Sequence, residues 1–145
     1  QLLPHAYLVT PNLEEAGLLT ERQVRTPADM RCAAKALEAM GSRSVLVKGG
    51  HLTGAPADLL LHDGQFLEFP GERVESRHTH GTGCTLSAAI TALLAGGNDL
   101  VESVRLAKRY VTEAIRTNPG LGAGSGPLNH HAGGAPRLAS ADREE

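Results

Sequence analysis

The apolar run Val45-Leu46-Val47 restricts the fold of this sequence more than any other feature. It is short and rich in β-branched residues, which is the pattern of a central parallel strand buried on both faces. A helix is predicted before it, because Thr26-Pro27 is an N-cap followed by a first-turn proline and Gly41 ends the segment. The apolar face of that helix carries Met30, Ala33, Ala34, Leu37 and Met40. A helix followed by a buried strand predicts an α/β fold.

The N-terminal segment extends this alternation. Residues 6–10, Ala-Tyr-Leu-Val-Thr, are predicted to form another buried strand. A short helix is expected over about 13–20, capped by Asn12 with Glu15 as the reciprocal partner. The chain begins at Gln1 without an initiator Met and enters a strand almost at once. We therefore expect it to be the back part of a longer polypeptide, or a processed or truncated product.

An antiparallel hairpin is predicted in the middle of the chain. Asp63-Gly64 is a dipeptide favoured in two-residue type I′ turns, and it separates apolar segments at 59–62 and 65–69. The expected sheet is therefore mainly parallel, with an antiparallel hairpin at its edge.

Two further helices are predicted after the hairpin. One begins at a glycine turn around Gly81 and ends at Gly96-Gly97, and the next begins at Asp99 and continues to about Thr117. Their apolar residues recur at helical spacing: Leu86, Ala89, Ile90, Leu93 and Leu94, then Leu100, Val104, Ala107, Val111 and Ile115. Residues 132–145 contain few large apolar side chains, so we expect a disordered tail there.

Composition excludes several classes of protein. The net charge is −2 and aromatic residues are few, which argues against a nucleic-acid surface. No apolar run approaches the roughly 20 residues that span a bilayer, and no signal peptide opens the chain. Two distant cysteines, Cys32 and Cys84, do not suggest a disulfide framework or a zinc site. We expect a reducing, cytoplasmic location, with neither a nucleic acid nor a membrane as partner.

The run His80-Gly81-Thr82-Gly83-Cys84-Thr85 opens the first of the two later helices. Glycine allows close approach of a ligand, and the unpaired amides of a first helical turn can point at one anion. The run either packs a helix tightly against a sheet or binds phosphate and a reacting hydroxyl, although its spacing is not that of a Walker A loop. Cys84 favours the second interpretation because a helix N-terminus stabilises a thiolate, whereas Cys32 in mid-helix is expected to be inert and buried.

Two other segments follow predicted strands. Asn12 and Glu15 either form only a helix cap, or also hold Mg²⁺ or its waters near nucleotide phosphates, since Mg²⁺ prefers oxygen ligands. Lys48 is either a solvated lysine or a point charge on a phosphate. Open α/β sheets bind ligands outside the carboxyl ends of strands, so we expect these segments and the glycine turn to converge on one crevice.

The histidines do not form a recognisable metal site. His78 and His80 are two residues apart and His130-His131 are adjacent, but no carboxylate or cysteine at ligand spacing completes either pair. We therefore expect no metal role for them. His80, beside the glycines, can still orient a phosphate.

Three motifs together resemble a known family, in their order and spacing. They are Thr-Pro-Asn-Leu-Glu-Glu-Ala at 10–16, Val-Lys-Gly-Gly-His-Leu at 47–52, and Thr-His-Gly-Thr-Gly-Cys-Thr-Leu-Ser-Ala-Ala-Ile at 79–90. They are similar to those of the hydroxymethylpyrimidine/phosphomethylpyrimidine kinases of thiamin biosynthesis, in the ribokinase-like superfamily. The third motif is the most specific, because sugar kinases of the superfamily usually carry Asp where Cys84 stands.

The resemblance runs from about residue 6 to 131, including the Gly-rich segment 120–131. It implies that residues 1–131 form the C-terminal part of a ribokinase-like three-layer α/β/α domain, followed by the tail at 132–145. Family members are nearly twice this long. Their front half supplies the first βα units and most of the pyrimidine pocket.

The resemblance also implies roles for individual residues. Cys84 is the expected general base, or lies beside the phosphate acceptor in a second phosphorylation. The turn residues Gly81, Thr82 and Gly83 form the expected anion hole. The nucleotide and its metal are assigned to Asn12 and Glu15 for Mg²⁺, Lys48 and Lys108 for ATP, and His80 for a phosphate.

The implied activity is ATP-dependent phosphorylation of hydroxymethylpyrimidine and its monophosphate, with ATP and Mg²⁺ as cofactors. Two alternatives are a pyridoxal-type kinase of the same superfamily, some of which share a cysteine in this loop, and a truncated nucleotide-binding fragment without activity. The expected partners are a small-molecule pyrimidine and either further copies in a homo-oligomer or the missing N-terminal half.

Overall fold

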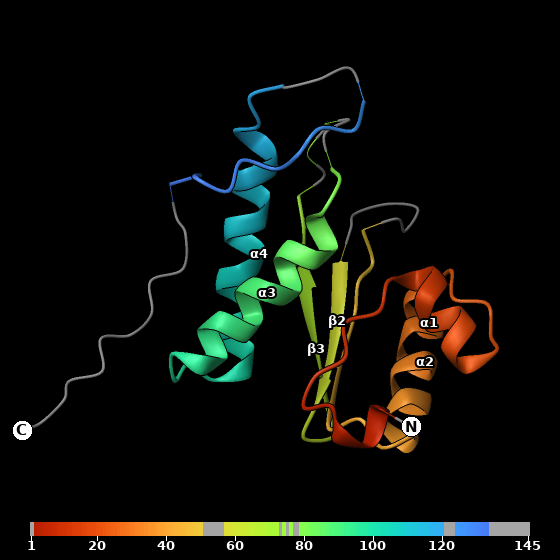
Figure 1. The fold of residues 1–145 in the computed structure, drawn as a ribbon. Coiled ribbons are helices and arrows are strands. Elements are labelled where there is room, and N and C mark those ends of the chain that lie inside the picture. The colour runs from red at the N-terminus through yellow and green to blue at the C-terminus, as the bar shows by residue number, and fades with distance from the viewer. Residues whose placement is uncertain are drawn as a thin grey trace, which may run out of the picture. The chain divides into compact units, whose positions relative to one another are not determined.

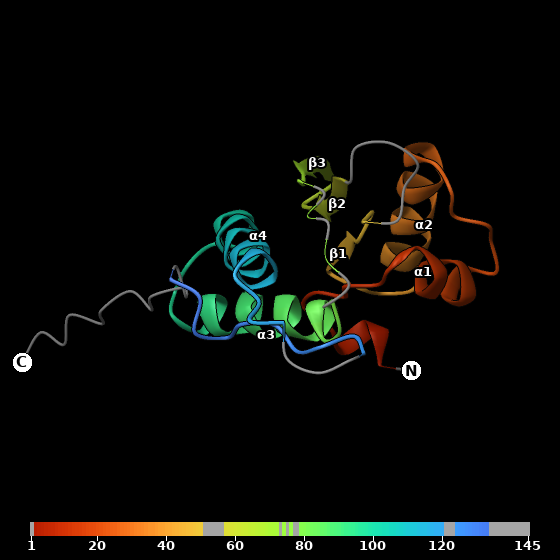
Figure 2. The ribbon, with the colours of Figure 1, turned by 90° about the horizontal axis from the view of Figure 1, so that it is seen from above.

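The computed structural model describes residues 2–50, 57–72, 74, 76, 79–120 and 124–133. By its internal contacts the chain divides into two compact units, residues 1–73 and 74–145. Figure 1 shows the helices and strands of each unit, and Figure 2 adds the label of β1. The tail predicted at 132–145 lies almost entirely outside the described residues, as do His51 and His78.

The first unit combines helices with a small sheet. In chain order its elements are the 3₁₀ turn η1 (Leu3–His5), the helices α1 (Leu13–Thr20) and α2 (Pro27–Ala39), and the strands β1 (Ser44–Val47), β2 (Ala57–His62) and β3 (Gln65–Pro70). The strands pair antiparallel in the order β1-β2-β3, and β2 and β3 lie side by side in Figure 1. Asp63 and Gly64 both have positive φ, as a type I′ turn requires, so the predicted hairpin is confirmed.

One face of this sheet packs against α2. The contact is apolar on both sides and comes from the helix residues Met30, Ala33, Ala34 and Leu37 and the strand residues Val45, Val47, Leu59 and Leu61. Alternate strand residues contribute, as the two-residue period of a strand requires. The predicted apolar face of α2 is confirmed, except that the helix ends at Ala39 and Met40 is an exposed C-cap.

The expected strand over residues 6–10 is reduced to an extended segment with isolated pairing. Parallel bridges join Val9 to Val45 and Asn12 to Lys48, and the Leu46 N–H donates to the Val9 carbonyl at 2.8 Å. Tyr7 is exposed and Val9 is only half-buried, because among the described residues this segment pairs with β1 alone. The prediction of a buried strand here is wrong, and the predicted mainly parallel sheet is not confirmed, since the assigned strands pair antiparallel.

The second unit contains two helices that pack on each other. They are α3 (Thr82–Ala95) and α4 (Leu100–Arg116), and they lie side by side in both Figure 1 and Figure 2. Asp99 caps α4 by accepting the Glu102 N–H at 2.8 Å. Both helices were predicted from the sequence, and most of the predicted apolar faces are buried. Leu94 and Ile115 of those faces are only half-buried, and α4 also buries Ser103, Tyr110 and Ala114.

The α/β class is confirmed by this mixture of helices and strands. No helix within the described ranges is long and apolar enough to cross a membrane.

Candidate functional site

Lys48 lies at the carboxyl end of β1, immediately after Val47. Its Nζ donates a hydrogen bond of 2.6 Å to the carbonyl oxygen of Thr10, and lies 3.8 Å from Oε2 of Glu15. The lysine side chain is 19% exposed and that of Glu15 is 55% exposed. The ammonium is therefore held in place and still reachable from solvent.

The Asn12 side chain caps α1, as its sequence predicts. The Glu15 N–H donates to Asn12 Oδ1 at 2.8 Å, and the Asn12 N–H donates to Glu15 Oε2 at 2.7 Å. The cap interpretation is thus confirmed, and the same carboxylate also lies beside Lys48. A parallel bridge joins Asn12 to Lys48, so Asn12, Glu15 and Lys48 form one cluster.

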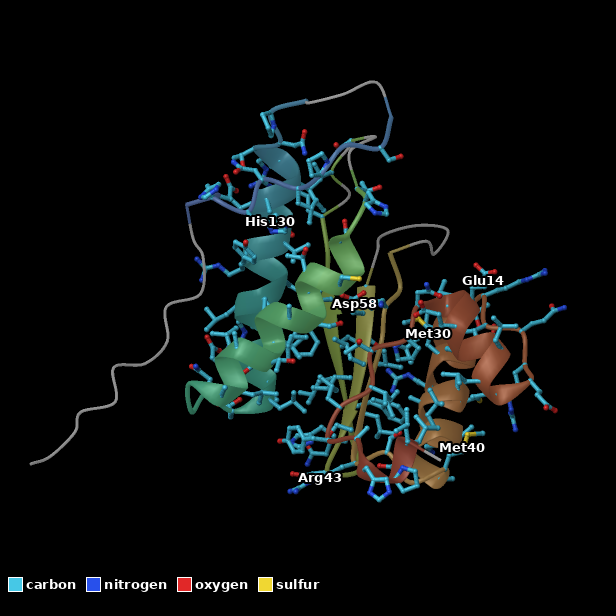
Figure 3. All side chains as sticks on the ribbon, viewed as in Figure 1. Glu14, Met30, Met40, Arg43, Asp58 and His130 are labelled. Carbon is cyan, nitrogen blue, oxygen red and sulfur yellow. The ribbon has the colours of Figure 1, made fainter. Side chains whose placement is uncertain are left out.

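Asp58 belongs to this cluster and was missed in the sequence, where the strand was predicted to begin at residue 59. It is the second residue of β2, is labelled in Figure 3, and is 8% exposed. Its Oδ1 accepts the N–H of Gly49 at 2.9 Å, which fixes the backbone directly after Lys48. The sequence contained one signal for this role, a carboxylate at the start of an otherwise apolar run. A carboxylate buried with such a strand needs a polar partner nearby.

The glycine turn, residues Gly81–Cys84, forms the N-terminus of α3 in the second unit. Gly81 is the N-cap with φ +84°, a left-handed conformation that favours glycine. The Thr82 hydroxyl donates to the Thr79 carbonyl at 2.6 Å, and the Thr85 N–H donates to the Gly81 carbonyl at 2.8 Å. Within the described part of the chain, the N–H groups of Gly83 and Cys84 have no acceptor. Two amides at a helix N-terminus are therefore available to an anion.

Cys84 is exposed at this helix N-terminus. Cys32 is exposed too, so the prediction that it is buried is wrong. It lies on α2 between Arg31 and Ala33, and the buried face of that helix is formed by other residues. Exposure alone therefore does not distinguish the two thiols. They differ in position, because Cys84 lies in the first turn of its helix and Cys32 lies within α2.

The remaining predicted site residues lie in the second unit. His80 is exposed and forms an isolated parallel bridge with Pro127, and Lys108 is half-buried on α4. Among the residues that the structure describes, no group of three or more His, Cys, Asp or Glu side chains could hold a metal ion.

The structure thus brings the predicted residues together in two groups. Asn12, Glu15 and Lys48 form one in the first unit, and His80 with the glycine turn forms the other in the second. That both groups line one crevice stays a prediction.

Comparison with solved structures defines the class of this fold. The ADP complex of Bacillus subtilis pyridoxal kinase aligns with a TM-score of 0.86 and 38% identity, over 91% of this chain and 52% of the kinase. The fold is therefore that of an α/β kinase similar to pyridoxal kinase. The family model for phosphomethylpyrimidine kinase matches residues 1–129. The chain belongs to the phosphomethylpyrimidine kinase family, as its motifs predicted.

Two relatives show the extent of the match. The hydroxymethylpyrimidine/phosphomethylpyrimidine kinase of Streptomyces coelicolor is 46% identical over 130 residues, which is 90% of this chain and 48% of that protein. The thiamine biosynthesis bifunctional protein ThiED of Geobacter sulfurreducens is 48% identical over 131 residues, or 27% of its length. The chain thus spans about half the length of the first relative and about a quarter of the second.

Proposed function

We propose that this chain takes part in ATP-dependent phosphoryl transfer to hydroxymethylpyrimidine and its monophosphate. One observation carries the proposal: the glycine turn presents two unpaired amides beside an exposed thiol in a member of this family. Preorganised N–H donors suit the charge that develops on a transferred phosphoryl group, and positioning with charge stabilisation is most of what such an enzyme supplies.

In the proposed reaction, the Cys84 thiolate takes the proton from the substrate hydroxyl. The hydroxyl oxygen forms a bond to the γ-phosphorus of ATP while the bond to the bridging oxygen of ADP breaks. Gly81, Thr82 and Gly83 supply the anion hole, and His80 orients a phosphate at its edge. Lys48 places its positive charge on the nucleotide phosphates, with Lys108 as a second contact to the nucleotide.

The Asn12 and Glu15 pair could supply one carboxylate oxygen to Mg²⁺. Glu15 uses Oε2 for the helix cap and the Lys48 contact, whereas Oε1 has no partner among the described residues. The Asn12 backbone N–H donates to Glu15 Oε2 and so orients the carboxylate, whereas Asn12 Oδ1 accepts the Glu15 N–H and completes the cap. One carboxylate together with substrate phosphates and waters is a usual environment for Mg²⁺, which when bound neutralises phosphate charge.

We further propose that residues 1–131 are the C-terminal part of a ribokinase-like three-layer domain with a mainly parallel sheet. The two parallel bridges between the segment at 9–12 and the β1 region support this arrangement. The length of the Streptomyces coelicolor relative supports a pyrimidine pocket completed by additional sequence or by a second copy of the chain.

Phosphorylation of pyridoxal is a second candidate activity, favoured by the structural similarity to the Bacillus subtilis pyridoxal kinase. The third candidate is nucleotide binding without turnover. Comparing turnover of the purified chain on hydroxymethylpyrimidine and on pyridoxal, alongside calorimetry with Mg-ATP, separates all three. We expect faster turnover on the pyrimidine alcohol. Binding of Mg-ATP with no product would support the third candidate.

Replacement of the thiol tests the assignment of the base. We expect Cys84→Ala to lower turnover by roughly 10² or more, the usual contribution of a general base. Cys32→Ala is the matched control, because it removes an exposed helical thiol from the other unit. Near wild-type turnover in Cys84→Ala would exclude Cys84 as the base.

A further inference from the structure

Residues 126–132, here named the return segment, contact both the carboxyl end of α4 and His80, the residue before the glycine turn. Pro127 forms a parallel bridge with His80, and the Asn118 side chain donates a hydrogen bond to the Pro127 carbonyl. Leu128 and Ala132 are buried against Ala114 of α4. The segment therefore contacts both the helix end and the entry to the glycine turn.

Asn129 bonds to the end of α4 through its backbone N–H and its side-chain Nδ2, and its two oxygens accept bonds within the return segment. Its N–H donates to the Ala114 carbonyl at 3.1 Å, and its Nδ2 donates to the Thr117 hydroxyl at 3.0 Å and the Thr117 carbonyl at 3.3 Å. Its Oδ1 accepts the His131 N–H at 3.1 Å, and its carbonyl accepts the Ala132 N–H at 3.1 Å. The last carbonyls of a helix lack helical partners, so Asn129 satisfies part of the α4 terminus.

A further hydrogen bond from α4 reaches the backbone of the return segment rather than one of its side chains. The Tyr110 hydroxyl donates to the His130 carbonyl at 3.1 Å, which fixes backbone without using a side chain of the segment. Of the side chains in the return segment, that of Asn129 makes the hydrogen bonds to α4 that the structure describes. Losing its amide group therefore removes the side-chain hydrogen bonds that hold the segment on the carboxyl end of α4.

The glycine turn is fixed by a few local contacts. A Cβ placed on Gly81 would have no atom within 4 Å, so no side chain fills the space on that side of the turn. Among the described residues, the turn is held by the bonds from Thr82 to Thr79, by the Thr85 N–H bond to the Gly81 carbonyl and by the bridge between His80 and Pro127. An anion hole works only when its donors lie within hydrogen-bond distance of the developing charge, so small displacements of the turn are costly.

We propose that Asn129 is a positioning residue for the glycine turn: it clamps the return segment to α4, and Pro127 thereby fixes His80 and the amides that follow. This inference rests on the proposed function only for its effect on turnover. Its effect on the conformation of the turn is independent of any activity. Both effects can therefore be measured separately.

The test compares Asn129→Ala with Asn98→Ala. Asn98 is the matched control, because its Nδ2 also donates to a helix-end carbonyl, that of Leu93 at 3.0 Å, but it lies at the opposite end of α3. We expect both variants to have a lower Tm. Only Asn129→Ala should shift the amide NMR signals of Gly81, Gly83 and Cys84 and accelerate their hydrogen exchange.

The kinetic readout is a split between kcat and KM for the pyrimidine alcohol. We expect Asn129→Ala to lower kcat by about 10-fold or more with KM nearly unchanged, because misplaced groups cost rate more than ground-state binding. Unchanged amide signals in Asn129→Ala would overturn the proposal, as would an equal loss of kcat in Asn98→Ala. If the wild-type chain has no turnover, the amide signals still decide the proposal while the proposed function fails.

A milder pair of variants covers the case in which Asn129→Ala does not fold. Thr117→Val removes the hydroxyl acceptor of the Asn129 amide, whereas Thr117→Ser retains it. We expect the first to shift the amide signals of the glycine turn and the second to leave them in place. Identical spectra for the two variants would count against the proposal.

Discussion

The Lys48 ammonium and the Thr10 carbonyl oxygen are joined by a hydrogen bond of 2.6 Å. The bond links the carboxyl end of β1 to the extended segment that runs parallel to it. An ammonium has three protons, so two remain for other partners, and Oε2 of Glu15 lies 3.8 Å from Nζ. Lys48 is therefore held in a fixed position rather than fully solvated, and its role as a phosphate contact stays a prediction.

Lys48→Gln tests this interpretation. The substitution keeps a donor for Thr10 but removes the charge, and a hydrogen bond to a charged group contributes about 1.5–3 kcal/mol. We expect the affinity for Mg-ATP, measured by calorimetry, to fall about 10-fold or more. Lys35→Gln removes an exposed lysine from α2 of the same unit and should leave affinity unchanged. Equal affinities in all three proteins would exclude Lys48 as a contact to the nucleotide phosphates.

The two capping boxes of the first unit allow an effect on protein stability to be distinguished from an effect on Mg-ATP binding. Asn12 caps α1 and Thr26 caps α2 in the same way, with Glu15 and Asp29 as the reciprocal partners. Replacing either N-cap by Ala should lower the free energy of unfolding by about 1 kcal/mol. Only Asn12→Ala should also weaken Mg-ATP binding, because loss of the Oδ1 cap loosens the turn in which the Asn12 backbone N–H holds the Glu15 carboxylate beside Lys48.

Chemical denaturation measures the first effect and calorimetry the second. Glu15→Gln completes the set, since it keeps a side-chain acceptor for the cap but loses the charge. It should reduce the dependence of binding on Mg²⁺ with little change in stability. If Thr26→Ala weakens Mg-ATP binding as much as Asn12→Ala does, Asn12 acts only as a helix cap and has no separate role in binding.

The sequence predicted what depends on local chemistry. The cap at Asn12 follows from its partner three residues on, and the cap at Thr26 follows from the proline after it. The turn at Asp63-Gly64 follows from conformations that few residues adopt. The helices were predicted for the same reason, because their apolar period is visible in the chain. Nothing beyond a few neighbouring residues was needed for these elements.

Features that depend on distant pairing were not predicted. Residues 6–10 have the composition of a buried strand, but a central strand needs a partner on each edge and cover on both faces, and the described chain pairs this segment with the β1 region alone. The Asp58 contact with Gly49 and the hydrogen bonds of Asn129 with Thr117 join residues separated by a loop, so no spacing rule reveals them. The motif resemblance predicted the family and the glycine turn, but not what holds that turn.

Gly81→Ala should damage the glycine turn without a steric clash. A Cβ at Gly81 would meet nothing within 4 Å, so the cost comes from its φ of +84°, which is about 1–2 kcal/mol for a residue with a side chain. Relaxation of that strain moves the amides of Gly83 and Cys84. We expect turnover to fall about 10-fold or more, since oxyanion-type donors act only at hydrogen-bond distance.

Gly124→Ala is the control for this substitution. Gly124 belongs to the same unit, has equally open surroundings and lacks a positive φ. Its replacement should change neither the Tm nor turnover. Turnover that survives Gly81→Ala at the wild-type rate would show that the turn only starts a helix.

The pH dependence of stability should reveal the α2 capping box through Asp29. The N–H groups of Arg25 and Thr26 donate to Asp29 Oδ2 at 3.0 and 2.9 Å. These bonds, first that of Arg25 and then those of Thr26, hold the pKa of the Asp29 carboxyl below its ordinary value of 3.8. Because the folded pKa is the lower one, the stabilisation is complete above the unfolded pKa and is lost as the pH falls through the folded pKa.

Asp29→Asn should therefore have a lower Tm than the wild type at neutral pH. The difference should narrow as the pH falls below about 4, where the wild-type carboxylate takes up its proton in the unfolded state first. Thermal unfolding at a series of pH values measures it. Glu21→Gln, an exposed change at the end of α1, should show no such trend. A Tm difference between Asp29→Asn and the wild type that stays constant down to about pH 2 would mean that the ionised carboxylate contributes nothing to the cap.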